Sequence, residues 1–146
     1  MNDQPIAYTA EGRPLYDNTP TVVAVLVHHM GELLIIRRAN DPGKGLLGLP
    51  GGYHMRGETW QEAGAREVLE ETATVVDLSS FKLISMETDE YGNNLVIASA
   101  EYERYTNAAK DGEALEAMWA YGVGEPAEWA FPRHYEAAKR FFEGRF

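Results

Sequence analysis

The sequence GYHMRGETWQEAGAREVLEETAT, residues 52–74, places three glutamates at helical spacing directly after a glycine-rich turn. They are Glu67, Glu70 and Glu71. At about 100° per residue, side chains at i, i+3 and i+4 fall within roughly a third of the helix circumference, which predicts that the three carboxylates share one face. Like charges at this spacing destabilise an isolated helix by roughly 0.2–0.5 kcal/mol per pair. Helix stability alone therefore does not explain the cluster.

An oxygen-only cluster of this kind suits a hard divalent cation. Mg²⁺ and Mn²⁺ prefer carboxylate ligands, keep several waters, and share their remaining positions with substrate phosphates. The cluster therefore predicts a site for Mg²⁺ or Mn²⁺ together with a phosphate group. For three acidic residues taken alone, the alternative is a solvated acidic face of a helix.

The residues around the cluster favour the metal site. Gly52 is followed after five residues by Glu58, then after seven more by Arg66-Glu67, Val68, one further residue and Glu70-Glu71. This pattern closely resembles the signature of the Nudix hydrolases. Six fixed identities at fixed offsets arise by chance on the order of 10⁻⁵ of the time in a chain of this length.

The end of the signature departs from the family pattern. Relatives have a glycine and then an aliphatic residue where this chain has Ala73 and Thr74. A glycine there would serve the helix C-terminus, where a left-handed residue is easiest without a Cβ. We therefore expect the helix either to end differently or to continue toward Val75, and the chemistry to be less affected because the expected ligands lie upstream.

The resemblance implies an α/β fold, an α/β/α sandwich with a mixed β-sheet between helices. It also implies a Mg²⁺-dependent hydrolase that cleaves the phosphoanhydride bond of a nucleoside diphosphate linked to another group, such as ADP-ribose or NADH, or of a nucleoside triphosphate. One alternative is a catalytically silent nucleotide-binding sensor with the same fold. Another is an interaction module whose acidic helix is a partner surface. Many relatives form dimers, so a homodimer is compatible with the resemblance.

The resemblance also assigns roles to residues. Glu67, Glu70 and Glu71 are expected to bind the metal, with Glu71 the first choice, and the backbone carbonyl of Gly52 can join them. One of these glutamates, or a downstream loop glutamate, is expected to take the proton from water, and the sequence does not decide which. The two residues expected to orient the ligands are Arg66 and Glu58, for which the alternative is a surface ion pair.

Other candidates lie farther along the chain. Glu113, and less strongly Glu116, stand where many relatives carry a further metal-binding or basic glutamate. Arg37 and Arg38 end a predicted strand, and one of them is expected to clamp a phosphate, although a routine strand-end charge fits equally well. Aromatic side chains more often belong to the core. Those considered for stacking on the base or sugar are Tyr53, Tyr91, Trp119 and Trp129. The histidines show no metal spacing and are interpreted as structural or surface groups, with His54 a weak candidate for substrate contact.

Hydrophobic patterning predicts alternating strands and helices. Residues 21–29 form a continuous β-branched run, which is typical of a strand covered on both faces. The helix that carries the glutamates is expected to begin at a capping box, Thr59 with Glu62, and to pack its other face, Ala65, Val68, Leu69 and Thr72. Ala63 and Gly64 fit either a close glycine loop or helix–sheet packing. The remaining predicted elements are strands at 32–38, 81–89, 94–102 and 116–123, and a closing helix at 134–144.

Composition fits one compact domain. The chain has 146 residues, 45% of them hydrophobic, which suffices for one core. We expect residues 1–18 to form a polar arm or edge strand and residues 19–146 a single domain. A net charge of −10 argues against nucleic-acid binding. The absence of cysteine excludes disulfides and thiolate metal sites. No segment has signal or transmembrane character, so a cytoplasmic protein without membrane contact is expected.

Overall fold

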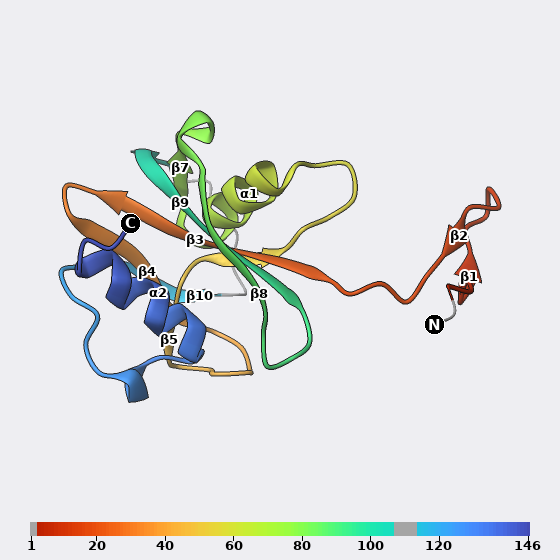
Figure 1. The fold of residues 1–146 in the computed structure, drawn as a ribbon. Helices are drawn as coiled ribbons and strands as arrows, with labels where there is room; N and C mark the ends of the chain where they lie inside the picture. Colours follow the sequence, from red (N-terminus) through yellow and green to blue (C-terminus); the bar gives the residue numbers. More distant parts are fainter. Residues whose placement is uncertain (1–2, 107–113) are drawn as a thin grey trace.

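A computed structural model describes residues 3–106 and 114–146 (Figure 1). Two α-helices cover the two faces of a mixed β-sheet, as predicted, and a separate two-stranded sheet precedes them. No helix in the described ranges combines the length and hydropathy needed to cross a membrane. The elements are β1 (Ala7–Tyr8), β2 (Pro14–Leu15), β3 (Thr21–His29), β4 (Glu32–Arg38), β5 (Leu47–Gly48), β6 (Gly51–Tyr53), α1 (Trp60–Thr72), β7 (Thr74–Val76), η1 (Leu78–Ser80), β8 (Lys82–Thr88), β9 (Asn94–Tyr105), β10 (Ala114–Ala120), η2 (Pro126–Glu128) and α2 (Pro132–Phe142).

Strand β3 lies at the centre of the sheet. The order is β10-β4-β3-β9-β7, with β5, β6 and β8 paired to β4, β3 and β9 respectively. β3 runs parallel to β9 from Thr21 opposite Asn94 to His28 opposite Glu101. It is antiparallel to β4 near their shared turn and to β6 near its own start. The glycine-containing strand β6 is therefore hydrogen-bonded directly to the central strand.

Alternate side chains of β3 enter two different cores. Val23, Val25 and Val27 pack in the core on the α1 side, whereas Ala24 and Leu26 pack on the α2 side. All five are essentially inaccessible to solvent, which confirms a strand covered on both faces. Full burial of a valine or leucine side chain contributes roughly 1.5–3 kcal/mol.

Helix α1 begins as predicted and ends in a way that resolves the doubt about Ala73. Glu62 N–H donates to Thr59 Oγ1 (3.0 Å) and Thr59 N–H donates to Glu62 Oε1 (2.8 Å), which completes the capping box. The helix stops at Thr72, and Ala73 adopts the left-handed conformation, with φ of 57°. This conformation costs a non-glycine residue roughly 1–2 kcal/mol. Because the Ala73 side chain is buried, its methyl group recovers up to about 0.8 kcal/mol of that cost.

The small residues of α1 serve helix–sheet packing. A Cβ added to Gly64 would lie 2.9 Å from Phe81 Cε1 and 3.0 Å from Val25 Cγ2. Ala63 belongs to the same core. Of the two explanations for these residues, close approach of the helix to the sheet is the one that the structure supports.

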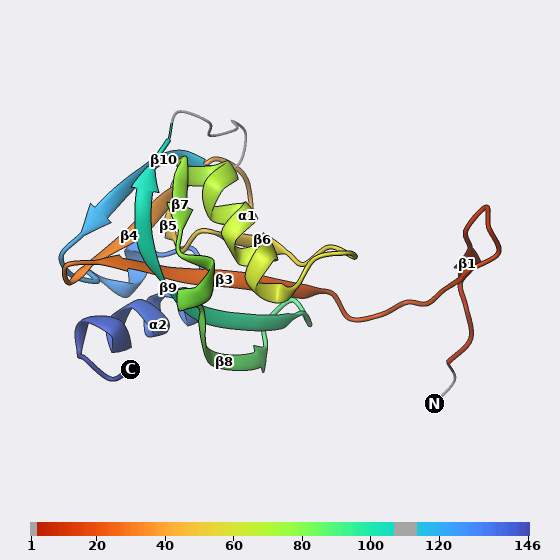
Figure 2. The ribbon, with the colours of Figure 1, turned by 90° about the horizontal axis from the view of Figure 1, so that it is seen from above.

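Several element boundaries differ from the predicted ones. β9 extends to Tyr105 because its last residues pair with β7, a short strand that the hydrophobic pattern did not reveal. β10 begins and ends earlier than predicted, and α2 starts at Pro132, where a proline at the first helical position needs no hydrogen-bond partner for its nitrogen. The β1–β2 hairpin stands apart from the body of the molecule in both views (Figures 1 and 2).

We expect Gly51→Ala to lower the free energy of unfolding by about 1–3 kcal/mol, because an added Cβ would collide with backbone atoms of β3. It would overlap Val23 O and lie 2.8 Å from Ala24 Cα. Gly122→Ala is the matched control, since no atom lies within 4 Å of a Cβ there and its φ is not in the left-handed region. Urea denaturation measures the free energy of unfolding of both variants. Equally small decreases in the two variants would contradict the expected overlap.

Candidate active site

A cavity of about 810 Å³ lies beside β6 and α1. Four of the predicted metal ligands, Gly52, Glu67, Glu70 and Glu71, line it together with residues from the β8–β9 turn and from the start of α2. Its polar and aromatic lining residues include Gly52, Tyr53, Arg66, Glu67, Glu70, Glu71, Arg38, Asn40, Asp89, Glu90, Tyr91, Asn93, Phe131, Arg133 and His134. The cavity therefore joins the glutamate helix to segments distant in the sequence.

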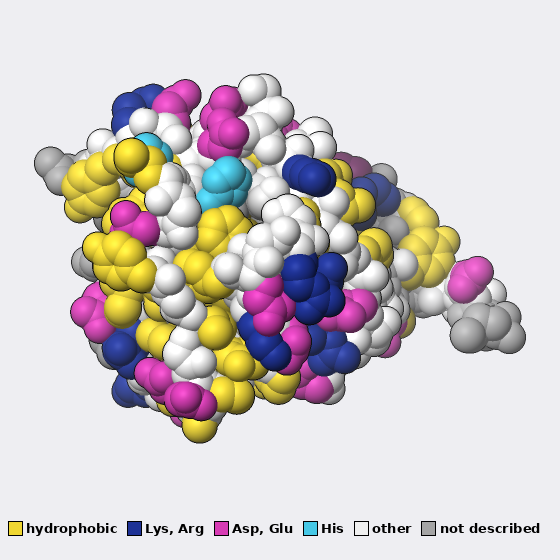
Figure 3. Space-filling view, turned by 60° about the vertical axis from the view of Figure 1, so that its left-hand side comes forward, with side chains coloured by type: hydrophobic (Ala, Val, Ile, Leu, Met, Phe, Trp, Pro, Cys, Tyr) yellow, Lys and Arg dark blue, Asp and Glu magenta, His cyan; other side chains and the backbone are white. Residues whose placement is uncertain are grey.

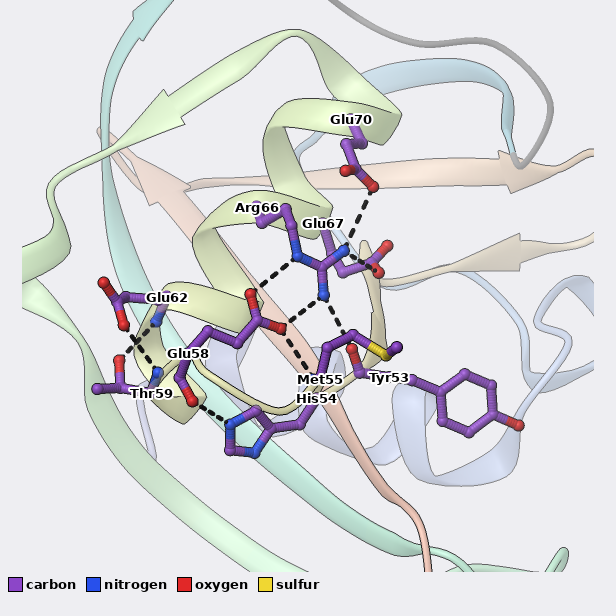
Figure 4. A network of polar contacts seen from close by, with 9 residues as sticks. All are labelled: Tyr53, His54, Met55, Glu58, Thr59, Glu62, Arg66, Glu67 and Glu70. Carbon is purple, nitrogen blue, oxygen red and sulfur yellow. Dashed lines mark hydrogen bonds and ion pairs between the residues drawn. The ribbon is translucent and has the colours of Figure 1, made fainter. Parts of the chain in front are cut away.

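The ion pair between Arg66 and Glu58 connects the loop before α1 to the helix itself (Figure 4). Two hydrogen bonds join the side chains, Arg66 Nη2 to Glu58 Oε1 (2.8 Å) and Arg66 Nε to Glu58 Oε2 (3.0 Å). Hydrogen bonding from Arg66, reinforced by the N–H of Met55, lowers the pKa of Glu58 to about 2. The same bond raises the pKa of Arg66 above its ordinary value. Arg66 also donates to Tyr53 O (3.0 Å), so the guanidinium holds two points of the loop.

The three glutamates border one cavity but contact different groups. Arg66 Nη1 lies 2.9 Å from Glu67 Oε1 and 3.4 Å from Glu70 Oε2 (Figure 4). Glu71 Oε1 accepts a hydrogen bond from Gly51 N–H (2.8 Å). The expectation that the glutamates lie opposite the packed face of α1 needs correction for Glu67, which is itself among the buried residues of the helix.

The donor set fits a hard divalent cation, although its arrangement here is not that of a metal centre. Within residues 3–106 and 114–146, no three acidic, histidine or cysteine side chains surround a common point. Three carboxylates nevertheless line the same cavity, which is the ligand chemistry of Mg²⁺ and Mn²⁺. A Cβ at Gly52 would lie 2.5 Å from Glu67 Oε1, so only glycine brings the backbone this close to that carboxylate. Arg66 contacts one oxygen of Glu67 and one oxygen of Glu70, so the second oxygen of each carboxylate is the one that could bind a cation while these contacts persist.

The two candidate arginines at the end of β4 lie in different places. Arg38 lines the cavity, where its guanidinium sits 4.8 Å from the centre of the Phe131 ring and its Nε donates to Pro42 O (2.7 Å). Arg37 does not line the cavity and pairs instead with Glu116 (2.9 Å). Glu113 lies outside the described residues.

The four aromatic candidates also differ in where they lie. Tyr53 and Tyr91 are exposed and line the cavity. Trp129 is buried, and its indole N–H donates to Val123 O (2.8 Å). Trp119 packs edge-on against Tyr102 beside the core on the α1 side. The two tryptophans are therefore structural.

The start of α2 supplies cavity residues that the sequence did not single out. His134 is buried, and its Nδ1 accepts a hydrogen bond from Leu49 N–H (3.1 Å), which ties α2 to the segment before the glycine turn. Burial, with a smaller effect of the Arg38 charge, lowers the pKa of His134 to about 4. Because Nδ1 is an acceptor, the neutral ring carries its proton on Nε2. Nearby, Arg133 pairs with Glu87 (3.1 Å) and Glu90 (2.8 Å), which connects α2 to β8 and to the turn after it.

No local pattern could have identified these α2 residues. A lone histidine on a helix has no partner spacing, and its partner Leu49 lies 85 positions away. The one available signal is Pro132, which marks a helix start but says nothing about what faces a cavity.

Comparison with known proteins supports the resemblance in the sequence. A family model for the NUDIX domain matches residues 17–141. An ADP-ribose pyrophosphatase of Methanocaldococcus jannaschii is 38% identical over 66 residues, which make up 45% of this chain and 39% of that protein. The match thus spans less than half of the relative.

Solved structures show the same fold. A NUDIX hydrolase from Nitrosomonas europaea has a TM-score of 0.78 at 22% identity, over 94% of this chain and 78% of that one. The NUDIX domain of Shewanella oneidensis NrtR, complexed with ADP ribose, has a TM-score of 0.69 at 20% identity, over 89% of this chain and 90% of that one. A match over 94% must include residues before 17, because residues 17–146 make up a smaller share of the chain.

We expect the stability of the protein to fall as the pH is lowered from 6.5 toward 4, because His134 is neutral when buried and charges when the chain unfolds. The sign follows from a folded-state pKa below the ordinary value, so the unfolded state binds the extra proton in this range. At about 1.4 kcal/mol per pKa unit, the loss is roughly 3 kcal/mol at most.

Urea denaturation from pH 7.5 to 4.5 measures this loss, with His134→Gln as the test variant. The free energy of unfolding of this variant should change less with pH than that of the parent protein. His29→Gln, an exposed histidine, is the control and should leave the dependence unchanged. Parallel curves for the parent and His134→Gln would contradict the assignment.

Proposed function

This chain belongs to the Nudix family, and we propose that it is a metal-dependent hydrolase that cleaves the phosphoanhydride bond of a nucleoside diphosphate linked to a second group. The observation that carries the proposal is the cavity itself. Three carboxylates of α1 line it together with three arginines, Arg38, Arg66 and Arg133, and two exposed tyrosines. Carboxylates suit divalent cations, whereas guanidinium groups and aromatic rings suit phosphates and bases.

Glu67, Glu70 and Glu71 are the residues that would hold Mg²⁺ or Mn²⁺, joined by the backbone carbonyl of Gly52. When bound, the cation supplies Lewis-acid stabilisation of the phosphate and lowers the pKa of a water molecule. The alternative explanation, a solvated acidic face of the helix, fits poorly with Glu67, because its side chain is buried and paired with Arg66 rather than exposed to water.

The chain's own residues orient the ligands. Glu58 fixes the Arg66 guanidinium by two hydrogen bonds, and Arg66 in turn contacts Glu67 and Glu70. The N–H of Gly51 fixes Glu71 from the other side of the turn. One of the glutamates accepts the proton of the attacking water. Such supporting contacts commonly matter as much as the ligands, because they set the direction in which each carboxylate points.

ADP-ribose is the substrate that we favour. A relative that matches part of the chain is an ADP-ribose pyrophosphatase, and a NUDIX domain of similar fold was crystallised with ADP ribose. A cavity of about 810 Å³ falls within the range of roughly 300–1,000 Å³ typical of small-molecule sites. Arg38 would contact the diphosphate or terminal phosphate, and Tyr53 and Tyr91 the base or sugar. NADH and nucleoside triphosphates are the next candidates.

A nucleotide-binding sensor without turnover is the second candidate. The observation that favours it is Arg66, whose guanidinium contacts both Glu67 and Glu70 and so already neutralises part of the negative charge that would attract a cation. A sensor would bind ADP-ribose in the same cavity without hydrolysing it.

We expect Glu71→Gln to lower the rate of ADP-ribose hydrolysis at least about 100-fold, because general-base and ligand positions typically contribute 10²–10⁴. The assay measures release of AMP and ribose 5-phosphate with Mg²⁺ and with a chelator, and is repeated with NADH and nucleoside triphosphates. Glu62→Gln is the matched control on the same helix. It is exposed, does not line the cavity, and glutamine still satisfies the capping box.

The outcomes separate the candidates. Hydrolysis that depends on Mg²⁺ and is lost only in Glu71→Gln supports the hydrolase. Tight ADP-ribose binding without products supports the sensor. Neither binding nor turnover with any compound of the panel would overturn both proposals.

We also expect 10 mM Mg²⁺ or Mn²⁺ to raise the thermal midpoint by a few degrees, since a cation bound at ten times its dissociation constant stabilises the folded state by about 1.4 kcal/mol. Potassium chloride at equal ionic strength is the control, because a chain with a net charge of −10 is also stabilised by general screening. The rise in thermal midpoint beyond that seen with potassium chloride should vanish when Glu67, Glu70 and Glu71 are all replaced by glutamine. An increment of equal size in that variant would rule out these residues as the site.

A further inference from the structure

His134 presents a hydrogen-bond donor to the cavity. Its ring lines the cavity and is 8% exposed. Because Nδ1 accepts from Leu49 N–H (3.1 Å), the proton of the neutral ring is on Nε2. Within residues 3–106 and 114–146, Nε2 has no hydrogen-bond partner, and it is not one of the polar atoms that the protein encloses completely. Polar groups of buried side chains almost always have a partner, so the partner of this N–H comes from outside the chain.

Burial sets His134 apart from other histidines of the chain. Histidine side chains are visible at the surface in the space-filling view (Figure 3), and His29 is exposed. Burial is the main cause of the low pKa of His134, so its ring stays neutral at physiological pH. A donor without charge suits an uncharged acceptor, such as a ring nitrogen, a carbonyl oxygen or a hydroxyl oxygen. Phosphate oxygens, by contrast, are typically bound by charged groups.

The side chains around His134 suit a nucleoside. The ring of Phe131 lies 4.9 Å from that of His134, and Tyr91 meets Phe131 edge-on at 6.2 Å between ring centres. The guanidinium of Arg38 lies 4.8 Å from the centre of the Phe131 ring. Nucleobases stack on aromatic rings and on guanidinium planes. Stacking groups and a neutral donor therefore lie together at the start of α2.

The turn that carries Tyr91 is held by its own hydrogen bonds. Asp89 Oδ1 accepts from the backbone N–H groups of Tyr91 and Asn93, both at 2.9 Å. The next residue, Glu90, pairs with Arg133 of α2 (2.8 Å). The turn and the start of α2 are thus fixed to each other without a ligand, which lowers the entropic cost of binding one.

We propose that His134 is a substrate-binding residue whose Nε2–H donates a hydrogen bond to an uncharged acceptor atom of the substrate's nucleoside, while Phe131 and Tyr91 contact the base. The inference rests on the proposed function in that it requires the cavity to bind a nucleotide. It assigns the α2 end of the cavity to the nucleoside and leaves the glutamate end to the diphosphate.

Two substitutions separate the binding role of His134 from its structural role. Asparagine places its amide oxygen near the position of Nδ1, so His134→Asn can still accept from Leu49 N–H but has no donor at the position of Nε2. Glutamine places its amide nitrogen near the position of Nε2, so His134→Gln keeps the donor and loses the acceptor.

Calorimetric titration with AMP, which has no phosphoanhydride bond to hydrolyse, measures the effect. His134→Asn should bind AMP about five- to tenfold more weakly than the parent protein, as expected for one lost neutral hydrogen bond. His134→Gln should bind AMP about as tightly as the parent. His29→Asn is the matched control at an exposed histidine outside the cavity and should bind like the parent. Circular dichroism checks that each variant is folded.

Nuclear magnetic resonance of the imidazole nitrogens gives a second measurement on the unaltered protein. AMP should shift the Nε2 signal of His134 and slow the exchange of its proton with water, whereas the signals of His29 should not change. The signal that disappears in His134→Gln identifies His134.

The outcomes distinguish this inference from the proposed function. A parent protein that binds no nucleotide would overturn both. If the parent binds AMP, the inference alone is overturned when His134→Asn binds it equally tightly, when only His134→Gln loses binding, or when AMP leaves the Nε2 signal unchanged. Weaker binding of ADP-ribose by His134→Asn with unchanged binding of AMP would overturn the assignment of this end of the cavity to the nucleoside.

Discussion

The ion pair between Arg66 and Glu58 is the contact on which the geometry of the site depends. It joins the loop after β6 to the glutamate helix, and the same guanidinium reaches Tyr53 O, Glu67 and Glu70. Without such a positive charge, three carboxylates about one helical turn apart would repel one another. Because this network is partly shielded from solvent, loss of Arg66 would remove the positive charge that Glu58, Glu67 and Glu70 share, which costs more than a surface ion pair contributes.

The central strand β3 supports the glycine turn that borders the site. Gly51 and Gly52 are hydrogen-bonded to β3 through residues whose side chains form the two cores. The turn that fixes Glu71 is therefore held in place by the packing of the whole sheet. On the α2 side, His134 extends the same support to Leu49, just before the turn. The geometry of the candidate site and the packing of the core thus depend on the same backbone segments.

Local signals in the sequence predicted the local structure well. The capping box and the buried run of β3 depend on residues close together in the chain, and both were confirmed, as was the mixed α/β architecture. The predictions that needed contacts between distant residues were less complete. Nothing near Arg37 and Arg38 reveals that one lines the cavity while the other pairs with Glu116, and no periodicity identifies His134 or Arg133 as cavity residues. Their positions follow from strand register and helix docking, which a linear pattern does not encode.

Ala73 has a consequence for how members of this family are identified. The motif has a glycine at this position, but the physical requirement is a residue in the left-handed backbone conformation at the end of the helix. Here alanine adopts that conformation. The methyl group is itself buried, which compensates in part for the less favourable torsion. The helix ends at Thr72, downstream of Glu67, Glu70 and Glu71, so all three glutamates lie within it. A sequence search that insists on glycine would therefore overlook chains that share this architecture, whereas one that weighs the upstream charged positions would find them.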